Sequence, residues 1–438
     1  MTFILSLGLF FRLLFIHQSL WLDESIEALA LMGRLGPLMQ YALADYQPPL
    51  YHLVGWVNTQ IFGYSELALR LPSLLSGMLT IYFVYRIGCL LVDHSTGRIA
   101  GLLAATNPLL IYYSVEGRTY ALTTFFVTAS FYYFIQLLDT NNHSKLNTLY
   151  YVLFTICFIY TSYLSWFLLL SMGIYALSKK RFDIVAMQVF SALTLLAWMP
   201  SFVSSLAIGQ STRMGSPQWG KVVGGLEWKS LPLTWVKFNI GRISFANKTL
   251  YAAIVMGLVA LHFSILRHFN LKKYLVLLIW LIPPVVLGLT TAYFLPVYSY
   301  FRLLFILPAY LLCLALSSKN LSRFVVVFNI IFVFVYAMTP SNHKENWRNL
   351  VAHIPAGSVV AMPSRAQSAP LRYYGYDKEI IEPSHEDLQG SPVFYIRYVE
   401  DLFDTKKAGQ ANFKESGYTI TSQRVYPGIQ VDIYENRN

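Results

Sequence analysis

Apolar runs long enough to cross a lipid bilayer recur along most of this sequence. A membrane-spanning helix needs about 20 mostly apolar residues. Such runs are centred near residues 9, 80, 105, 128, 154, 170, 194, 258, 284, 309 and 331. Only 13% of the residues are charged, about half the share of a typical soluble domain. The sequence therefore predicts an all-α polytopic membrane bundle of about eleven transmembrane helices.

Basic residues indicate which side of the membrane each loop faces, because cytoplasmic loops carry an excess of Lys and Arg. They gather in every second loop, near residues 86–98, 145, 179–181, 267–273 and 319–323. The loops at 18–66 and 207–247 then lie outside, although the second is itself basic. We expect a multi-pass protein of the plasma membrane. Its net charge of +11 suits contact with anionic membrane lipids rather than nucleic acid.

The composition changes after residue 340. Residues 1–340 form the predicted transmembrane domain. Its first outer loop, 18–66, carries juxtamembrane helices, and its second, 207–247, reads as an interfacial segment or a mobile lid. Residues 341–438 contain short segments in which apolar and polar residues alternate or apolar residues follow one another, as in strands, with helical stretches between them. We therefore expect a small α/β extracytoplasmic domain. Because this tail contains no chemical motif, a chain ending near residue 340 is expected to keep some turnover.

Two adjacent carboxylates, Asp23 and Glu24, follow the first apolar segment. Ionisable groups at membrane depth are costly and mark functional sites. Neighbouring side chains on a helix diverge by about 100°, so one acid can face a cavity while the other caps or orients. Alternatively, Asp23 is simply the N-cap of a helix over residues 25–35, with both acids near the positive end of its dipole.

Two arginines at outer helix ends are candidate ligands for a phosphate. Arg118 lies in the turn between the third and fourth spans, and Arg302 lies at the start of the tenth. A guanidinium binds phosphate bidentately, and a low-dielectric site strengthens the attraction. The structural alternatives are an ion pair between Glu116 and Arg118 and interfacial anchoring of Arg302. For Arg70, snorkelling to the lipid headgroups is favoured over a catalytic role.

Several other kinds of site are excluded by the sequence. It contains no P-loop, no dinucleotide-binding glycine fingerprint and no Gly-x-Ser-x-Gly motif. The histidines lack metal-ligand spacing. We therefore expect no nucleotide pocket, no metal centre and no required cofactor. Asp23 and Glu24 could hold a divalent ion, although no further ligand cluster in the sequence supports one.

Four segments together resemble the polytopic GT-C glycosyltransferases, most closely the protein O-mannosyltransferase and aminoarabinose-transferase-like bacterial proteins. They are Trp21-Leu22-Asp23-Glu24, Tyr46-Gln47-Pro48-Pro49-Leu50-Tyr51, residues 63–73 and residues 113–122. The match covers about the first 125 residues, while the middle and the tail are similar to the family only in layout.

The resemblance implies inverting transfer of a sugar from a polyprenyl-phosphate donor to a lipid, glycan or protein acceptor at the outer face, as in cell-envelope glycosylation. It implies that Asp23, with Glu24 beside it, supplies the general base. The residues expected at the donor phosphate are Arg118, Arg302, Glu116 and Tyr120, and those expected to position the acceptor or the loop are Tyr46, Gln47, Pro48 and Pro49. The alternative function is a multi-pass transporter or a lipid-linked-sugar flippase, because charges within the membrane also mark substrate paths.

Overall fold

The computed structural model describes residues 1–45, 47–139, 144–215, 227–384, 388, 390 and 392–436, with only the backbone for 209–215. The chain divides into two compact units. The first contains Met1–Ile16 and Arg34–Tyr336, and the second contains His17–Gly33 and Ala337–Asn438. The sequence-based division placed all of residues 18–66 in the first domain, whereas residues 17–33 group with the C-terminal part of the chain.

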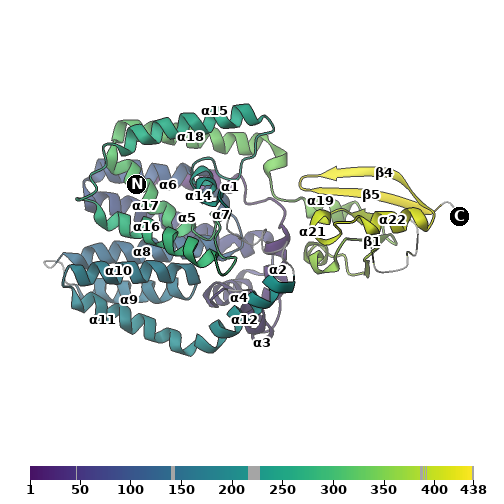
Figure 1. The fold of residues 1–438 in the computed structure, drawn as a ribbon, viewed down its shortest axis with the longest axis horizontal. Helices are drawn as coiled ribbons and strands as arrows, with labels where there is room; N and C mark the ends of the chain where they lie inside the picture. Colours follow the sequence, from purple (N-terminus) through teal and green to yellow (C-terminus); the bar gives the residue numbers. More distant parts are fainter. Residues whose placement is uncertain are drawn as a thin grey trace. The chain divides into compact units, whose positions relative to one another are not determined.

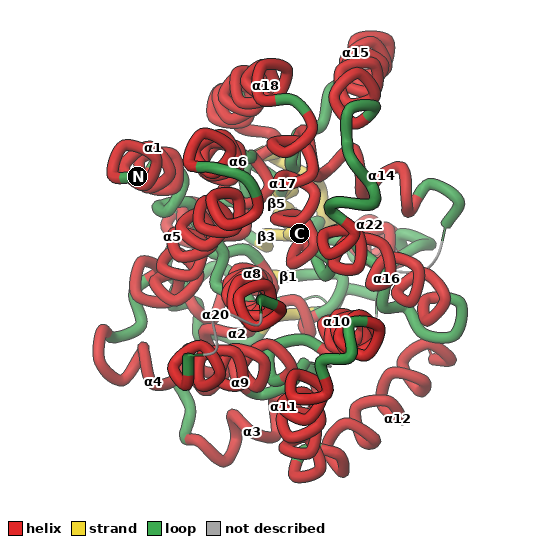
Figure 2. The backbone as a smooth tube through the Cα atoms, turned by 90° about the vertical axis from the view of Figure 1, so that its left-hand side faces the viewer, coloured by secondary structure: helices red, strands yellow, loops and turns green. Residues whose placement is uncertain are grey.

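The first unit is a helical bundle (Figures 1 and 2). Its first half contains α1 (Thr2–Leu13), α3 (Leu35–Ala44), α4 (Leu50–Phe62), α5 (Glu66–Leu91), α6 (His94–Thr106), α7 (Pro108–Ser114), α8 (Thr119–Leu138) and α9 (Lys145–Ile159). Its second half contains α10 (Trp166–Ser178), α11 (Phe182–Leu193), α12 (Met199–Gly215), α14 (Ser230–Ile240), α15 (Lys248–Leu266), α16 (Leu275–Ala292), α17 (Leu307–Ser317) and α18 (Lys319–Met338). Short 3₁₀ turns at Tyr163–Ser165, Thr194–Ala197 and Leu304–Ile306 join some of these helices.

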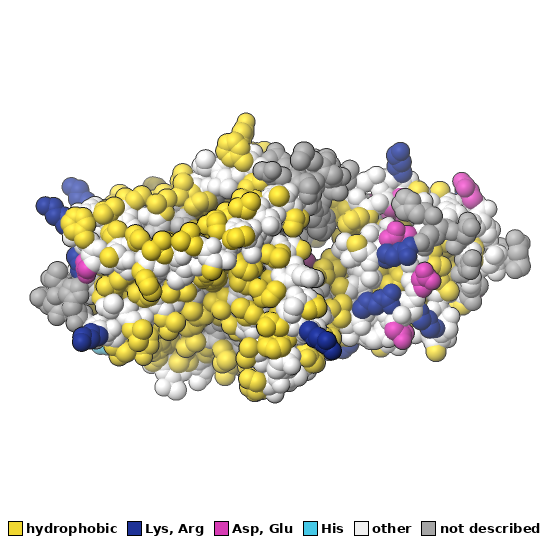
Figure 3. Space-filling model, turned by 90° about the horizontal axis from the view of Figure 1, so that it is seen from below, with side chains coloured by type: hydrophobic (Ala, Val, Ile, Leu, Met, Phe, Trp, Pro, Cys, Tyr) yellow, Lys and Arg dark blue, Asp and Glu magenta, His cyan; other side chains and the backbone are white. Residues whose placement is uncertain are grey.

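Each of the eleven predicted span centres lies in one of these helices or in its 3₁₀ continuation. By length and composition alone, five described helices can cross a membrane, namely α5, α8, α15, α16 and α18. A bent pair, Phe182–Ala197 with Met199–Ile208, raises the number to six. Hydrophobic side chains cover the visible face of this unit in Figure 3, as expected where lipid replaces water. The multi-pass bundle is confirmed, and the number eleven stays a prediction.

The predicted lid at 207–247 is only partly described. The second half of α12 and all of α14 are helical within it. Residues 216–226 lie outside the described residues, so the lid interpretation stays a prediction.

Two arginines are fully buried in the first unit. Arg12 Nη1 donates to the carbonyls of Gly8 (2.9 Å) and Ala105 (3.3 Å), close to the break between α6 and α7. Arg70 Nη1 donates to the carbonyl of Ile16 at 2.6 Å. The snorkelling predicted for Arg70 is therefore wrong, because its side chain has no exposed surface and points into the protein.

The second unit is a small α/β domain, as predicted, and it also includes α2 (Leu22–Leu31). Its sheet has the strand order β2-β1-β3-β5-β4, with β1 parallel to β2 and β3, and β5 antiparallel to β3 and β4. The strands are β1 (Val359–Ala361), β2 (Ile380–Ile381), β3 (Val393–Ile396), β4 (Tyr418–Tyr426) and β5 (Ile429–Asn436). The helices are α19 (Trp347–Ala352), α20 (Ala369–Tyr373), α21 (Glu400–Phe403) and α22 (Ala408–Glu415). The predicted extracytoplasmic location of this domain stays a prediction.

The apolar core of the second unit holds α2 in place. Leu22 packs in one cluster with Trp347, Leu350, Tyr376 and Tyr398. The adjoining chain is tied down as well, because the hydroxyl of Tyr374 accepts from the N–H of Leu20 at 2.7 Å. The segment that carries Asp23 and Glu24 is thus built into the C-terminal domain.

Candidate active site

Helix α2 presents Asp23 and Glu24 in its first turn. Trp21 is the N-cap, with extended backbone angles and no side-chain cap hydrogen bond. The alternative that Asp23 itself is the N-cap is therefore wrong, and the helix begins at Leu22 instead of residue 25. Both carboxylates still lie where the helix dipole favours negative charge.

Glu24 is held by a buried ion pair. Its Oε2 lies 2.9 Å from Lys344 Nζ, and both side chains are only 1% exposed. The backbone N–H of Lys344 donates to Gln18 Oε1 at 3.4 Å. Removing one partner of such a buried pair typically costs about 3–5 kcal/mol. Glu24 is therefore placed to hold α2, and the ammonium beside it disfavours a metal ion shared by Asp23 and Glu24.

Asp23 is partly exposed and influences Tyr398 in the same unit. Burial raises the pKa of the Tyr398 phenol, and the negative charges of Glu345 and Asp23 raise it further. The Tyr398 hydroxyl donates to Glu345 Oε1 at 3.1 Å, so it stays protonated. The next residue, Val399, has φ +47°, which is a strained conformation for a β-branched residue.

The first unit brings three of the predicted site residues to one hollow. We call it the Arg302 hollow. It is lined by Gln47, Thr119, Tyr120, Thr123, Ser162, Phe301, Arg302, Leu304 and Phe305. Arg302 Nη1 donates to the Pro296 carbonyl at 2.9 Å, and the rings of Tyr120 and Phe301 meet edge to face at 5.2 Å. The hollow thus combines a guanidinium, a phenol and an amide.

The Tyr-Gln-Pro-Pro segment leads into α4 beside this hollow. Gln47, Pro48 and Pro49 are buried, and Pro49 is the N-cap of α4. The next N–H, that of Leu50, donates to the carbonyl of Tyr160 at 3.0 Å. Tyr46 lies outside the described residues.

Arg118 binds an acid that the sequence analysis did not single out. Its Nη2 donates to both carboxylate oxygens of Asp45, each at 3.1 Å, and its Nη1 donates to the Tyr41 hydroxyl at 3.2 Å. His52 Nε2 lies 3.6 Å from the same carboxylate. These contacts hold the turn between α3 and α4, which contains Gln47. Asp45 directly precedes the Tyr-Gln-Pro-Pro segment, and this position is the sequence feature that could have pointed to it.

Glu116 is fully buried in the turn between α7 and α8. Its backbone carbonyl accepts from the N–H of Arg118 at 2.8 Å. The phosphate-binding roles predicted for Arg118 and Glu116 stay predictions, while the contacts of Arg118 favour a positioning role.

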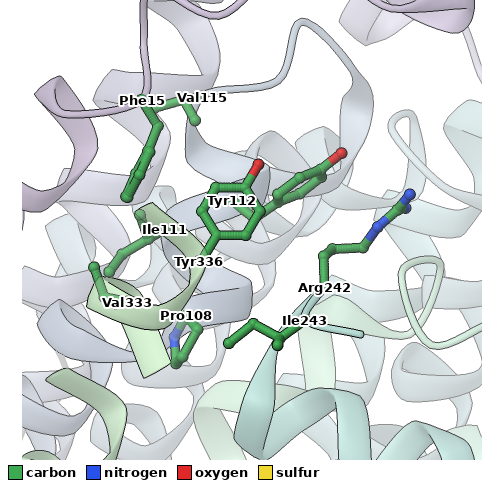
Figure 4. Close-up of a pocket in the computed structure, with 9 residues that line it drawn as sticks. All are labelled: Phe15, Pro108, Ile111, Tyr112, Val115, Arg242, Ile243, Val333 and Tyr336. Atoms are coloured by element: carbon green, nitrogen blue, oxygen red, sulfur yellow. The ribbon is translucent and has the colours of Figure 1, made fainter. Parts of the chain in front are cut away.

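A second hollow lies beside Arg242, and we call it the Arg242 hollow. It is lined by Phe15, Pro108, Ile111, Tyr112, Val115, Arg242, Ile243, Val333 and Tyr336. In Figure 4 the two tyrosine rings lie between Arg242 on one side and the apolar Ile111 and Val333 on the other. The guanidinium lies 5.0 Å from the centre of the Tyr112 ring. Arg242 is one of the basic residues that make the 207–247 loop an exception to the positive-inside rule, and this exception is the sequence feature that could have pointed to it.

An aromatic cluster lies beside both hollows. Arg242 Nη1 donates to the Tyr113 hydroxyl at 3.5 Å. The Tyr113 ring lies 5.1 Å from Tyr120 and 6.3 Å from Phe301, and those two residues line the Arg302 hollow. Guanidinium groups among aromatic rings suit a ligand that is anionic at one point and apolar or ring-shaped elsewhere.

Comparison with known proteins supports a common architecture. Residues 46–208 match the family model described as dolichyl-phosphate-mannose-protein mannosyltransferase. No curated protein sequence matches the chain. ArnT from Cupriavidus metallidurans bound to undecaprenyl phosphate superposes with a TM-score of 0.55 at 11% identity, over 99% of this chain and 97% of that one. Its apo state gives 0.56 at 9% identity, with the same coverage.

The apo oligosaccharyltransferase of Archaeoglobus fulgidus superposes with a TM-score of 0.50 at 12% identity, over 97% of this chain and 74% of that one. At these identities the likeness concerns the fold. The chain therefore shares the fold of these solved structures.

Proposed function

The chain has the GT-C fold of glycosyltransferases that use polyprenyl phosphate, and from this premise we propose that it is an inverting glycosyltransferase. It moves a sugar from a polyprenyl-phosphate donor to an acceptor hydroxyl at the outer face of the inner membrane. The acceptor is a lipid, a glycan or a protein of the cell envelope. The chain needs no nucleotide pocket, because the membrane delivers the donor.

The observation that carries this proposal is the Arg302 hollow, where Gln47, Tyr120 and Arg302 line one space. A sugar phosphate needs a cation at its phosphate and hydrogen-bonding groups at its ring. Arg302 supplies the cation, and the phenol and the amide supply hydrogen bonds. Arg242, beyond the Tyr113 ring, offers a second cation. The ArnT structure bound to undecaprenyl phosphate supports a lipid phosphate as the class of ligand.

The reaction needs one base and one stabilised leaving group. The Asp23 carboxylate accepts the proton of the acceptor hydroxyl, whose oxygen attacks the anomeric carbon. The bond from that carbon to the phosphate oxygen breaks, and the polyprenyl phosphate leaves with the electron pair. A single displacement inverts the anomeric centre, so the two closely spaced carboxylates of a retaining enzyme are not required. Guanidinium groups stabilise the charge that develops on the phosphate.

The proposed roles of the remaining residues follow from their contacts. Arg118 holds the turn that carries Gln47 through Asp45. Pro48 and Pro49 fix the direction in which the chain enters α4, because proline restricts its own backbone and that of the preceding residue. Glu24 holds α2 through Lys344. We propose that the reaction requires no cofactor.

The experiment is sugar transfer by the purified protein in lipid vesicles, with a panel of polyprenyl-phosphate-linked sugars and an envelope extract as acceptor. Asp23→Asn is expected to abolish transfer without changing the melting temperature. Asp377→Asn, at an exposed acid of the same unit, is the matched control. NMR of the product is expected to give the anomeric configuration opposite to that of the donor.

Two outcomes contradict the proposal. If Asp23→Asn keeps full activity, Asp23 is not the general base. Movement of the intact lipid-linked sugar between the leaflets, with no glycosidic product, identifies a flippase instead.

A further inference from the structure

We propose that the buried pair of Glu24 and Lys344 sets the charge balance beside Asp23, which makes Lys344 of the C-terminal domain a positioning residue for the general base. This inference rests on the proposed function, because it takes Asp23 to be that base. It also changes the role of the tail. The sequence predicted a peripheral domain, whereas here the tail supplies a charged residue to the active site.

The geometry is rigid at this point. Lys344 Nζ lies 2.9 Å from Glu24 Oε2, and both side chains are almost fully buried. Glu24 directly follows Asp23 in the first turn of α2. On the side of the tail, Lys344 is three residues before Trp347, which has no exposed surface and packs in the same cluster as Leu22. Neither partner can turn away without opening the core.

Glu24 and Lys344 carry opposite charges, and together these charges affect the ionisation of Asp23. While both partners are charged, their fields largely cancel at Asp23. If Lys344 becomes neutral, the negative charge of Glu24 remains next to Asp23 and disfavours a second carboxylate ion there. If Glu24 becomes neutral, the ammonium remains and favours the ionised form of Asp23.

Other charged and titratable groups on the elements packed against α2 also contribute. Glu345, just before α19, and Tyr398, just after β3, form a hydrogen-bonded pair. Arg348 of α19 donates to the carbonyl of His17 at 3.0 Å. Arg372 of α20 donates to the carbonyls of Tyr376 and Lys378. Glu27, buried and one turn along α2 from Asp23, contributes as well. None of these groups is substituted in the variants below, so the same groups act on Asp23 in each variant.

The test is the acid limb of the pH profile of kcat/KM for sugar transfer, measured on the full-length protein in vesicles. For a base that works as a carboxylate, activity falls as the pH drops below its pKa. Lys344→Met is expected to move this limb to higher pH by about one unit, and Glu24→Gln is expected to move it to lower pH by about one unit. The double variant, Glu24→Gln with Lys344→Met, is expected to return the limb close to its wild-type position.

Two charge-preserving variants separate this effect from a loss of packing. Glu24→Asp and Lys344→Arg keep both charges, and they are expected to leave the acid limb in place even if they lower kcat. If one neutralised variant fails to fold, the other single variant and the double variant still decide between a moved and an unmoved acid limb.

A purely structural ion pair predicts something different. The neutralised variants would then lose kcat and melting temperature together, with the acid limb unmoved, and this result would overturn the inference. Failure of the proposed function looks different again, because either the wild-type protein transfers no sugar or Asp23→Asn remains active.

Discussion

Replacing Arg118 by Lys tests whether this arginine acts through a fixed fork of hydrogen bonds. The guanidinium donates to both oxygens of Asp45 and to Tyr41. A lysine ammonium is a single point on a flexible stem, and it can reach one carboxylate oxygen without reproducing the fork. The substitution keeps the charge and removes two of the three hydrogen bonds.

The expected cost follows from those two bonds. A hydrogen bond to a charged group contributes about 1.5–3 kcal/mol to stability. The Asp45 side chain is 18% exposed, so water replaces part of this, and about 2 kcal/mol is a reasonable total for the pair. Each 1.4 kcal/mol changes an equilibrium constant tenfold. The conformation in which Arg118 holds the α3–α4 turn therefore becomes about 30-fold less favoured.

The assay is kcat/KM for the lipid-linked donor, with Arg34→Lys, at an exposed arginine of the same unit, as the matched control. We expect a fall of between about 10- and 30-fold for Arg118→Lys and no change for the control. If Arg118→Lys keeps kcat/KM within about twofold of wild type, the side chain behaves as a simple point charge, and the positioning role is refuted.

Three further predictions concern other parts of the site. Ending the chain after Pro340 is expected to abolish turnover, since it removes Lys344 and the core around Leu22; retained turnover in membranes would restore the peripheral role of the tail. Arg302→Met is expected to raise the KM for the donor about 30-fold, the equivalent of about 2 kcal/mol, whereas an interfacial anchor would leave KM unchanged. Gly241→Ala is expected to lower the melting temperature, because Gly241 has φ +70° and an added Cβ would lie 2.8 Å from Pro108; an unchanged melting curve would contradict this.

The helices could be located from the sequence because lipid imposes a simple requirement. Every backbone polar group in the bilayer must be bonded within the protein, so apolar runs become helices. The break between α6 and α7 was not predicted, although Asn107, which caps α7 with its side chain, and Pro108 in the first turn form a helix-start signal in the sequence. The strands β1, β3, β4 and β5 coincide with segments that run apolar or alternate in the sequence, whereas β2, with only two residues, gives too weak a pattern.

The partners of the charged residues were not readable from the sequence. Glu24 and Lys344 are 320 positions apart, and Arg118 and Asp45 are 73 positions apart. Such pairs are created by packing, and no local pattern records them. For the same reason the sequence did not show that residues 17–33 group with the C-terminal part of the chain, and it gave Arg242 no partner among the aromatic residues.

The central claim is that this protein breaks the bond between a sugar and a polyprenyl phosphate. The most direct measurement counts both products when the purified protein, in vesicles, is given a doubly labelled lipid-linked sugar and an acceptor. We predict that one polyprenyl phosphate is released for each sugar transferred, and that Asp23→Asn releases neither. Sugar that stays attached to its lipid under these conditions, with the wild-type protein folded, contradicts the account.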